Sequence, residues 1–376
     1  MRARALLACV GLMAFTGLGG GAASAHTAPQ ARVTTIVSGL DNPRDLAFGR
    51  DGRLYVAEAG HGGTHCFTEE ELGNVCLGFT SKISRVNVPR HSVTRIVRGL
   101  VSIADPDGFA ATGVDGVSVL GADRIYGIIA GSARGLPSGV LPTTTAAHAK
   151  RQLGRLIVAS NSGSWTSVAN VGNRDYRWSD HHRNLVPGQF PEANPYGVYA
   201  GPRSRWVVDA ASNTLDRIGP DGIVHIVKFI PNPPVSDSVP TCVDRGPDGA
   251  FYIGELTGGG NAPGSSVVWR WGPSAHRLTK WATGLTAVTG CGWGRDHRFY
   301  ATEFSTNGLE NAAPGTGRVV RVPRHSTSPI TIVDGLDFPG GFAAKRGALF
   351  VSDWSIAPAN SGGGPTGSVI RITLPS

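Results

Sequence analysis

The chain of 376 residues has few charged residues and no block of them. Asp, Glu, Lys and Arg make up 16% of the residues, and the positive side chains are scattered, with no run of five or more. We therefore expect no nucleic-acid partner, and we take the net charge of +8 as a matter of composition and solubility. An acidic partner such as an anionic envelope polymer is the alternative. Hydrophobic residues, at 40%, suffice for a packed core and exclude a disordered chain.

Familiar catalytic and membrane signatures are also missing. There is no Gly-x-Ser-x-Gly elbow, so an α/β-hydrolase serine site has no support. The glycine-rich segment 254–264 lacks the Lys-Ser/Thr ending of a phosphate-binding loop. Beyond the first 25 residues, no stretch is long and apolar enough to cross a bilayer. The catalytic residues, if any, are therefore unknown at this level.

Residues 1–25 have the pattern of a signal peptide. Arg2 and Arg4 precede the apolar run 5–18, which is short for a membrane span, and Ala23-Ser24-Ala25 fits a cleavage site. A retained N-terminal anchor is the alternative. We expect a mature chain of residues 26–376 that is secreted and forms one domain.

Cysteine is scarce, and its number suits an exported protein. Cys9 would leave with the signal peptide, so that Cys66, Cys76, Cys242 and Cys291 remain. An even number in an exported chain indicates disulfides, and four cysteines allow three pairings. Closeness in sequence favours a bond between Cys66 and Cys76, and the repeat described next favours one between Cys242 and Cys291. Their spacings do not resemble a zinc site.

One sequence pattern returns along the chain. The segment "GLDNPRDLAFGRDGRLYVAE" (39–58) has counterparts near residues 240, 285 and 336, each with two short apolar runs around a tight polar turn. Asp-Gly between apolar runs is a strong hairpin signal. Six such hairpins can be aligned, with first runs at 45–49, 113–120, 196–201, 241–245, 289–294 and 340–344 and second runs at 54–57, 124–129, 205–208, 251–254, 299–302 and 349–352.

Third and fourth apolar runs follow most hairpins, and four antiparallel strands form one propeller blade. The last unit ends after its third run, "GSVIRITL", while "RVTTIVSGL" (32–40) near the N-terminus matches the fourth run "PITIVDGL". The sequence therefore predicts an all-β, six-bladed β-propeller whose N-terminal strand closes the last blade. Two inserts in the second unit, 131–152 and 172–190, are expected to cover one face, the latter being partly helical.

The second runs end at acidic residues in five of the six units. Glu58, Asp209, Glu255, Glu303 and Asp353 would then surround one mouth of the central channel and could hold one divalent metal, such as Ca²⁺. The alternative is structural: such acids cap loop N–H groups or pair with third-strand arginines. Those arginines are Arg85, Arg217, Arg270, Arg321 and Arg371. Weaker candidate ligands are His61, His65 and Cys66 in "HGGTHC" and the run 180–182.

Longer motifs resemble the ScyD/ScyE family of exported bacterial proteins. They are "GLDNPRDLAFGRDGRLYVAEAG", "EANPYGVYAG" with "VVDAASNTLDRIGPDG", and "VPTCVDRGPDGAFYIGELTGG", and the resemblance covers nearly all of residues 33–374. It implies a six-bladed propeller of the TolB-like or NHL-like type, export, and no established activity. Here "PRD" replaces the expected "PRG", and "GGGNAPG" replaces a Phe-Pro-rich loop after Glu255.

The architecture is more distantly similar to the gluconolactonase and SMP-30 group, whose members hold one divalent metal at the channel mouth with Glu, Asn and Asp. Glu58, Asn194, Asp209 and Asp353 are the corresponding residue types here, without matching spacing. We expect a module that binds a small molecule, a glycan or a protein at the channel mouth. The alternatives are a divalent-metal-dependent lactonase-like hydrolase and a structural protein of the cell envelope. Oligomeric state does not follow from the pattern.

Overall fold

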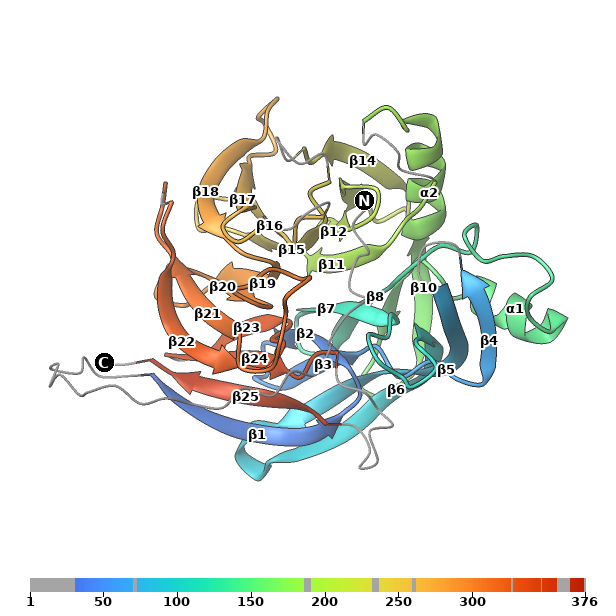
Figure 1. Ribbon diagram of the computed structural model, residues 1–376, viewed down its shortest axis with the longest axis horizontal. Coiled ribbons are helices and arrows are strands. Elements are labelled where there is room, and N and C mark those ends of the chain that lie inside the picture. The colour runs from blue at the N-terminus through green and yellow to red at the C-terminus, as the bar shows by residue number, and fades with distance from the viewer. Residues whose placement is uncertain are drawn as a thin grey trace, which may run out of the picture.

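The structure is a computed structural model that describes residues 31–69, 73–185, 191–231, 237–258, 262–325, 327–345, 347–356 and 366–374. The predicted signal peptide, residues 1–25, lies outside the described residues. Six antiparallel sheets surround a central axis (Figure 1), so the predicted six-bladed β-propeller is confirmed. The first strand of each blade lies nearest the axis, and these inner strands contact one another in ring order.

Each blade uses four successive strands from the axis outward. Blade 1 contains β2 (Pro43–Phe48), β3 (Leu54–Glu58), β5 (Gly73–Asn87) and β6 (Ser92–Ala104), with the short 3₁₀ helix η1 (Val88–Arg90) between the last two. Blade 2 contains β7 (Val114–Leu120), β8 (Arg124–Ile129), β9 (Arg155–Ala159) and β10 (Trp165–Asn170). Blade 3 contains β11 (Pro195–Ala200), β12 (Arg205–Asp209), β13 (Thr214–Ile218) and β14 (Val224–Phe229).

The remaining blades repeat this order. Blade 4 contains β15 (Pro240–Arg245), β16 (Phe251–Glu255), β17 (Ser266–Trp271) and β18 (Thr279–Leu285). Blade 5 contains β19 (Val288–Trp293), β20 (Phe299–Glu303), β21 (Gly317–Val322) and β22 (Ile330–Leu336). Blade 6 contains β23 (Phe342–Lys345), β24 (Ala348–Asp353), β25 (Gly367–Thr373) and β1 (Arg32–Leu40).

The N-terminal strand closes the ring, as predicted. β1 pairs antiparallel with β25 from Arg32 opposite Thr373 to Leu40 opposite Gly367. Closure joins the two ends of the chain within one sheet and leaves no blade without its fourth strand. The apolar side chains Ile36, Val37 and Leu40 of β1 are buried between blades 6 and 1.

Turn chemistry explains the inner hairpins, as blade 4 shows. Gly249 N donates to Gly246 O at 2.9 Å, and Gly249 has a φ of +77°, which favours glycine. Asp248 Oδ1 accepts from Ala250 N at 3.1 Å, and its Oδ2 accepts from the Tyr252 hydroxyl at 3.0 Å. The aspartate of the "GPDG" turn therefore shapes the turn and orients the aromatic residue of the second strand.

At one level along the axis, neighbouring inner strands lie so close together that no side chain fits between them. A Cβ added to Gly116 would lie 2.4 Å from the carbonyl oxygen of Tyr196, and one added to Gly197 would lie 2.6 Å from that of Thr241. Glycine at this level is therefore required by backbone packing between neighbouring blades.

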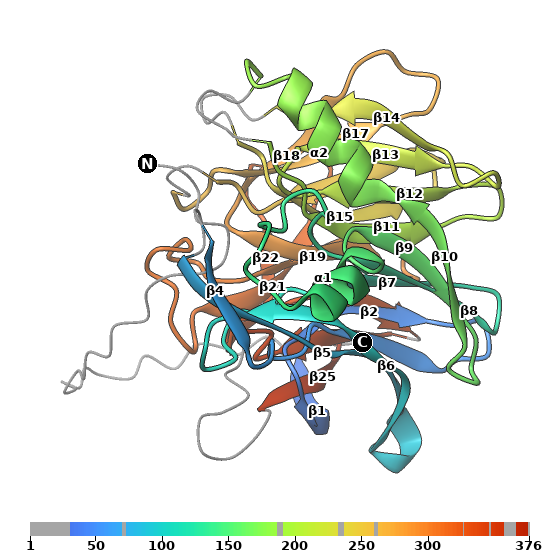
Figure 2. The same ribbon diagram turned by 90° about the vertical axis from the view of Figure 1, so that its right-hand side faces the viewer.

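Three additions extend the blades on one side of the ring (Figure 2). β4 (His65–Glu69) forms a hairpin with the first part of β5, α1 (Thr143–Lys150) lies in the first predicted insert, and α2 (Val171–His181) lies in the second. The partly helical second insert is thus confirmed. The first insert also contains a helix, which the Gly-, Pro- and Thr-rich composition did not predict.

Both favoured disulfides are present. Cys66 in β4 and Cys76 in β5 are bonded as directly opposed residues of the added hairpin. Cys242 and Cys291 join the inner strands β15 and β19 of neighbouring blades, with 5.7 Å between their Cα atoms. Among the helices that the structure describes, none is long and apolar enough to cross a membrane.

Candidate functional site

The acids at the ends of the second strands are buried. Glu58, Asp209, Glu255 and Glu303 are 0% exposed, and Asp353 is half-buried. They end β3, β12, β16, β20 and β24, while β8 of blade 2 ends at Ile129. A carboxylate that is buried to this degree needs hydrogen-bond donors or a cation beside it.

Four of these acids hold the backbone that leads into the first strand of their own blade. Glu58 Oε2 accepts from Asp41 N at 2.9 Å, and equivalent bonds run to Asp209 from Asn194 N (2.9 Å), to Glu303 from Thr286 N (3.2 Å) and to Asp353 from Asp337 N (3.0 Å). Glu255 instead accepts from Val267 N at 3.0 Å and from Trp269 Nε1 at 2.6 Å in the third strand. The capping role is therefore the one that the geometry shows.

Among the residues that the structure describes, none of the five predicted third-strand arginines pairs with a strand-end acid, although another third-strand arginine, Arg318 of β21, pairs with Glu303. In the described residues, the cations beside these acids are Arg318, 2.5 Å from Glu303, and Lys82, 3.9 Å from Glu58. Strand register explains the error, since each expected arginine lies opposite the aromatic residue of the second strand and not opposite its terminal acid. The opposed pairs are Tyr55–Arg85, Trp206–Arg217, Tyr252–Arg270, Tyr300–Arg321 and Phe350–Arg371.

The residues present do not fit a divalent metal at the mouth. No three His, Cys, Asp or Glu side chains among the described residues lie in position to hold a metal ion. Glu255 and Glu303 have both carboxylate oxygens engaged by protein donors. The backbone N–H of Asn194 donates to Asp209 and its carbonyl accepts from Ala210 N, so the chain around Asn194 serves the blade scaffold.

The weaker ligand candidates are also engaged elsewhere. His61 Nδ1 lies 2.7 Å from Asp41 Oδ2, which also accepts from Lys82 Nζ at 2.7 Å. Cys66 is in its disulfide, and Asp180 pairs with Arg183 on the surface. Asp41 is 1% exposed, and His61 and Lys82 together lower its pKa against the desolvation that would raise it. The cluster therefore keeps the buried Asp41 ionised beside the half-exposed imidazole of His61.

An apolar cluster occupies the mouth, which is the end of the ring where second strands finish and first strands begin. Its members come from the loops of blades 2 to 6 and from Tyr196 of β11, and Phe109, Leu309 and Trp354 are only half-buried. The buried members are Tyr196, Ala210, Val239, Leu256, Ala287, Phe304, Ala312, Phe338 and Ile356. The mouth therefore presents aromatic and aliphatic surface where sequence reasoning expected a ring of carboxylates.

Unusual backbone conformations aim residues at this cluster. Val239, Ala287 and Phe338 each stand just before a first strand and have φ of +47°, +47° and +48°. Positive φ is costly for a non-glycine residue, above all for the β-branched Val239, by about 1–3 kcal/mol. Asn42 has the same conformation in blade 1, where its side chain donates to the carbonyls of Gly60 and Gly108.

Below the cluster lies a buried polar ring that sequence reasoning missed. It is formed by the second residue of five inner segments: Arg44, Asp115, Tyr196, Thr241 and Thr289. Arg44 Nε lies 4.0 Å from Asp115 Oδ1, and both side chains are at most 2% exposed. The available signal was a polar or aromatic residue inside each apolar run, in "PRD", "VDG", "PYG", "PTC" and "VTG".

Burial perturbs the acids along the axis. Desolvation raises the pKa of Asp115 to about 6 against the opposing effect of Arg44, and it raises that of Asp45 to about 7. It also raises the pKa of Tyr196 to about 12, so its hydroxyl stays protonated. The cavity between these side chains measures about 30 Å³, room for water but not for an organic ligand.

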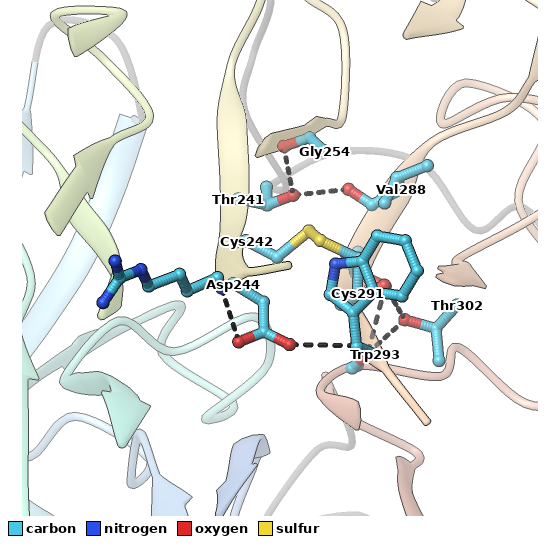
Figure 3. Close-up of a disulfide and its surroundings, with 12 residues drawn as sticks. Thr241, Cys242, Asp244, Gly254, Val288, Cys291, Trp293 and Thr302 are labelled. Carbon is cyan, nitrogen blue, oxygen red and sulfur yellow. Dashed lines mark hydrogen bonds between the residues drawn. A yellow bond between two sulfur atoms is a disulfide. The ribbon is translucent and has the colours of Figure 1, made fainter. Parts of the chain in front are cut away.

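The floor of this cavity is tied together across blades 4 and 5 (Figure 3). The Cys242–Cys291 disulfide lines the cavity, and Thr241 Oγ1 donates to Val288 O at 2.6 Å beside it. Two residues further along β15 and β19, Asp244 Oδ2 accepts from Trp293 N at 2.9 Å. These bonds make the axis a rigid scaffold under the mouth.

A second buried acidic group lies where α2 meets blade 3. Asp175 of α2 contacts Asp209 and Asp216, and all three carboxyls are 0% exposed. Neither oxygen of Asp175 receives a hydrogen bond from a donor group of the described residues. Desolvation and the two neighbouring carboxylates raise the pKa of Asp175 well above its ordinary value, and desolvation and Asp209 do the same for Asp216, so this group keeps a proton to higher pH than an exposed aspartate does.

Comparisons with known proteins identify the architecture. No protein-family model matches the chain, and no curated protein matches it by sequence. A solved gluconolactonase from Xanthomonas campestris has a TM-score of 0.52 at 10% identity and covers 92% of this chain and 90% of its own.

Two further solved structures give the same result. A putative oxidoreductase (glucose dehydrogenase) from Thermus thermophilus has a TM-score of 0.53 at 13% identity, over 91% of this chain and 99% of its own. A luciferin-regenerating enzyme has a TM-score of 0.52 at 11% identity, over 91% and 95%. Likeness at such low identity establishes the shared fold and carries no information on activity.

Proposed function

We propose that this chain is an exported binding module that recognises a small molecule, a glycan or a protein at the mouth of its channel. The observation that supports this most directly is the apolar cluster, whose half-buried Phe109, Leu309 and Trp354 offer contact surface on a rigid ring. Concave sites that combine aromatic surface with a few polar groups are typical of ligand recognition. Half-buried acids such as Asp105 and Asp353 lie in the same loops.

Export belongs to this proposal. The signal-peptide pattern of residues 1–25 and the two disulfides both suit an oxidising compartment outside the cytoplasm. Membership of the ScyD/ScyE family, on the motifs named above, is part of the same proposal and would fit a protein without established catalysis.

The alternative is a divalent-metal-dependent lactonase-like hydrolase. The fold of the Xanthomonas campestris gluconolactonase favours it, whereas the use of Glu58, Glu255 and Glu303 as buried caps weighs against it. The two proposals make opposite predictions about divalent metals and about Trp354.

The test titrates Ca²⁺, Mn²⁺ and Zn²⁺ calorimetrically into chelator-stripped mature protein and into Asp353→Asn, and then assays a panel of lactones and esters. A binding module shows no metal-dependent turnover. In parallel, glycan and peptide arrays are probed with wild type and Trp354→Ala, with Thr34→Ala on the exposed face of β1 as control. Ligands lost only in Trp354→Ala support the proposal; metal-dependent turnover that Asp353→Asn abolishes would overturn it.

A further inference from the structure

The end of the ring opposite the mouth carries many exposed arginines. This turn end comprises the turns that join first to second strands and third to fourth strands in each blade. Its exposed Lys and Arg side chains, among the described residues, are all arginines: Arg50, Arg53, Arg90, Arg124, Arg203, Arg245, Arg277, Arg295, Arg298 and Arg324. The exposed carboxylates of the same turns are half as many: Asp51, Asp123, Asp221, Asp248 and Asp296.

Contacts between turns show that these residues share one surface. Arg50 N donates to Gly121 O at 2.9 Å, which joins the turns of blades 1 and 2. Lys345 Nζ donates to Gly52 O at 2.6 Å, which joins those of blades 6 and 1. The other inner hairpins follow around the same axis, so their turns continue the surface.

Most aspartates of the turn end shape their own turns, and among the exposed arginines Arg245 also donates to a turn carbonyl, Gly249 O, at 3.2 Å. Asp51, Asp221, Asp248 and Asp296 each accept the backbone N–H two residues further on, at 3.1–3.2 Å, as turn-forming aspartates do. The ion pairs described at this end are Arg53–Asp51, Arg270–Asp248 and Arg298–Asp296. Turn chemistry therefore explains the acids and leaves the excess of arginines unexplained.

Two arginine patterns recur in different blades. The turn "GRDGR" (49–53) has its counterpart in "GRDHR" (294–298), so that Arg50 and Arg53 correspond to Arg295 and Arg298. The turn "VPRHS" occurs at 88–92 and again at 322–326, with His91 and His325 at φ of +51° and +55°. Within the described residues, Arg50, Arg90 and Arg203 have no carboxylate partner, so their guanidinium groups are available to a ligand, whereas Arg324 Nε donates to His325 Nε2 at 3.0 Å.

We propose that the turn end is the docking surface for an anionic polysaccharide that carries carboxylates. The planar guanidinium group binds carboxylates with two parallel hydrogen bonds, which lysine cannot do, and arginine is the cation used here. No Phe, Trp or Tyr side chain of the described residues is exposed, so the large stacking platforms of single-stranded nucleic-acid binders are missing from the described surface. The choice of polysaccharide rests on the proposed export, whereas the site itself is independent of the mouth.

The experiment uses the disulfide-bonded mature protein and polygalacturonate as the probe, with neutral dextran as the uncharged control, at an ionic strength of about 0.15 M. The test variant removes four positive charges from the turn end, and the matched control removes four from the loops and helices on the other side. We expect Kd to rise by about tenfold or more in the first and by less than about twofold in the second. The test variant combines Arg50→Ala, Arg53→Ala, Arg295→Ala and Arg298→Ala; the control combines Arg134→Ala, Lys150→Ala, Arg151→Ala and Arg177→Ala.

Other outcomes would overturn the proposal. Equal weakening in both variants would show a response to net charge alone, and no binding of polygalacturonate would remove the site. Tighter binding of duplex DNA or of phosphatidylglycerol vesicles would assign the surface to another partner. Unchanged thermal unfolding of both variants excludes misfolding as the cause. Trp354→Ala should leave this binding intact, which separates it from recognition at the mouth.

Discussion

At the scale of single residues, the clearest anomaly is Asp175. Its carboxyl is buried against those of Asp209 and Asp216, and its pKa is raised by desolvation and by both neighbours. The folded state therefore binds this proton more tightly than the unfolded state does. The resulting contribution to the free energy of unfolding is present at low pH and is lost as pH rises from about 4 through the raised pKa.

Asp175→Asn should stabilise the protein at alkaline pH. The amide has nearly the same shape, cannot ionise and can still donate to Asp209. We expect the free energy of unfolding at pH 8 to rise by about 1–3 kcal/mol, with little change near pH 4. Thermal unfolding across this pH range checks it, with the exposed Asp180→Asn on the same helix as control. Equal stability of wild type and Asp175→Asn at every pH would contradict the assignment.

Glu303→Ala tests the capping role of the strand-end acids. The substitution leaves the buried Thr286 N–H without its acceptor and Arg318 without its carboxylate. We expect a loss of about 2–4 kcal/mol in the free energy of unfolding, measured with urea. Glu310→Ala removes an exposed acid from the following loop and should change it by less than about 0.5 kcal/mol. A small loss in Glu303→Ala would mean that the cap is dispensable.

At the scale of elements, the two disulfides should differ in strength. Cys242–Cys291 closes a sequence separation of 49 and joins two blades, while Cys66–Cys76 closes one of 10 within a hairpin. The loop-entropy relation gives a stabilisation of about 4 kcal/mol for the first and about 3 kcal/mol for the second. The hairpin also lies outside the four-stranded blade, so its opening need not unfold the ring.

We therefore expect Cys242→Ala with Cys291→Ala to lower the free energy of global unfolding more than Cys66→Ala with Cys76→Ala does. Denaturant unfolding of the two double variants, with the wild-type protein oxidised, measures the difference. Hydrogen exchange of β4 should be faster in the second variant without a change in β15 and β19. The reverse order of stabilities would show that the hairpin bond supports the whole ring.

At the scale of the whole molecule, ring closure depends on β1. Removal of residues 26–40 would leave β25 as an unpaired edge and would expose the apolar contacts of Ile36, Val37 and Leu40 between blades 6 and 1. We expect the cooperative thermal transition to be lost or the protein to aggregate. Thr34→Ala, at an exposed position of β1, should leave the midpoint nearly unchanged. Cooperative unfolding of the deletion variant would mean that the other five blades hold the ring together.

Strand order was predictable because it rests on local signals. Each Asp-Gly turn and the alternating apolar residues beside it lie within a few residues of one another, and the match between 32–40 and the fourth runs can be read by comparing the repeats. The pairing of arginines with acids failed because it depends on cross-strand register. In β17, for example, Arg270 lies opposite Tyr252, three residues before Glu255, and it pairs with Asp248 in the turn.

The candidate site was harder to predict for the same reason. The inner-strand residues Arg44, Asp115 and Tyr196 are far apart in sequence and meet only because neighbouring blades place the same strand position around one axis. The mouth cluster likewise combines Tyr196 of β11 with side chains from separate loops of blades 2 to 6. Neither group forms a motif that can be read along the chain.

The sequence by itself determined the propeller, the number of blades and the closing strand, because a repeated hairpin specifies its own local hydrogen bonds and its place in the ring. It favoured both disulfides among the three possible pairings. Only the tertiary structure decided the role of Glu58, Asp209, Glu255, Glu303 and Asp353. Burial made hydrogen-bond donors obligatory for these carboxylates, and the nearest donors were backbone N–H groups, mostly of their own blades. The apolar mouth and the arginine-rich turn end arose in the same way, from side chains that six blades bring to a common surface.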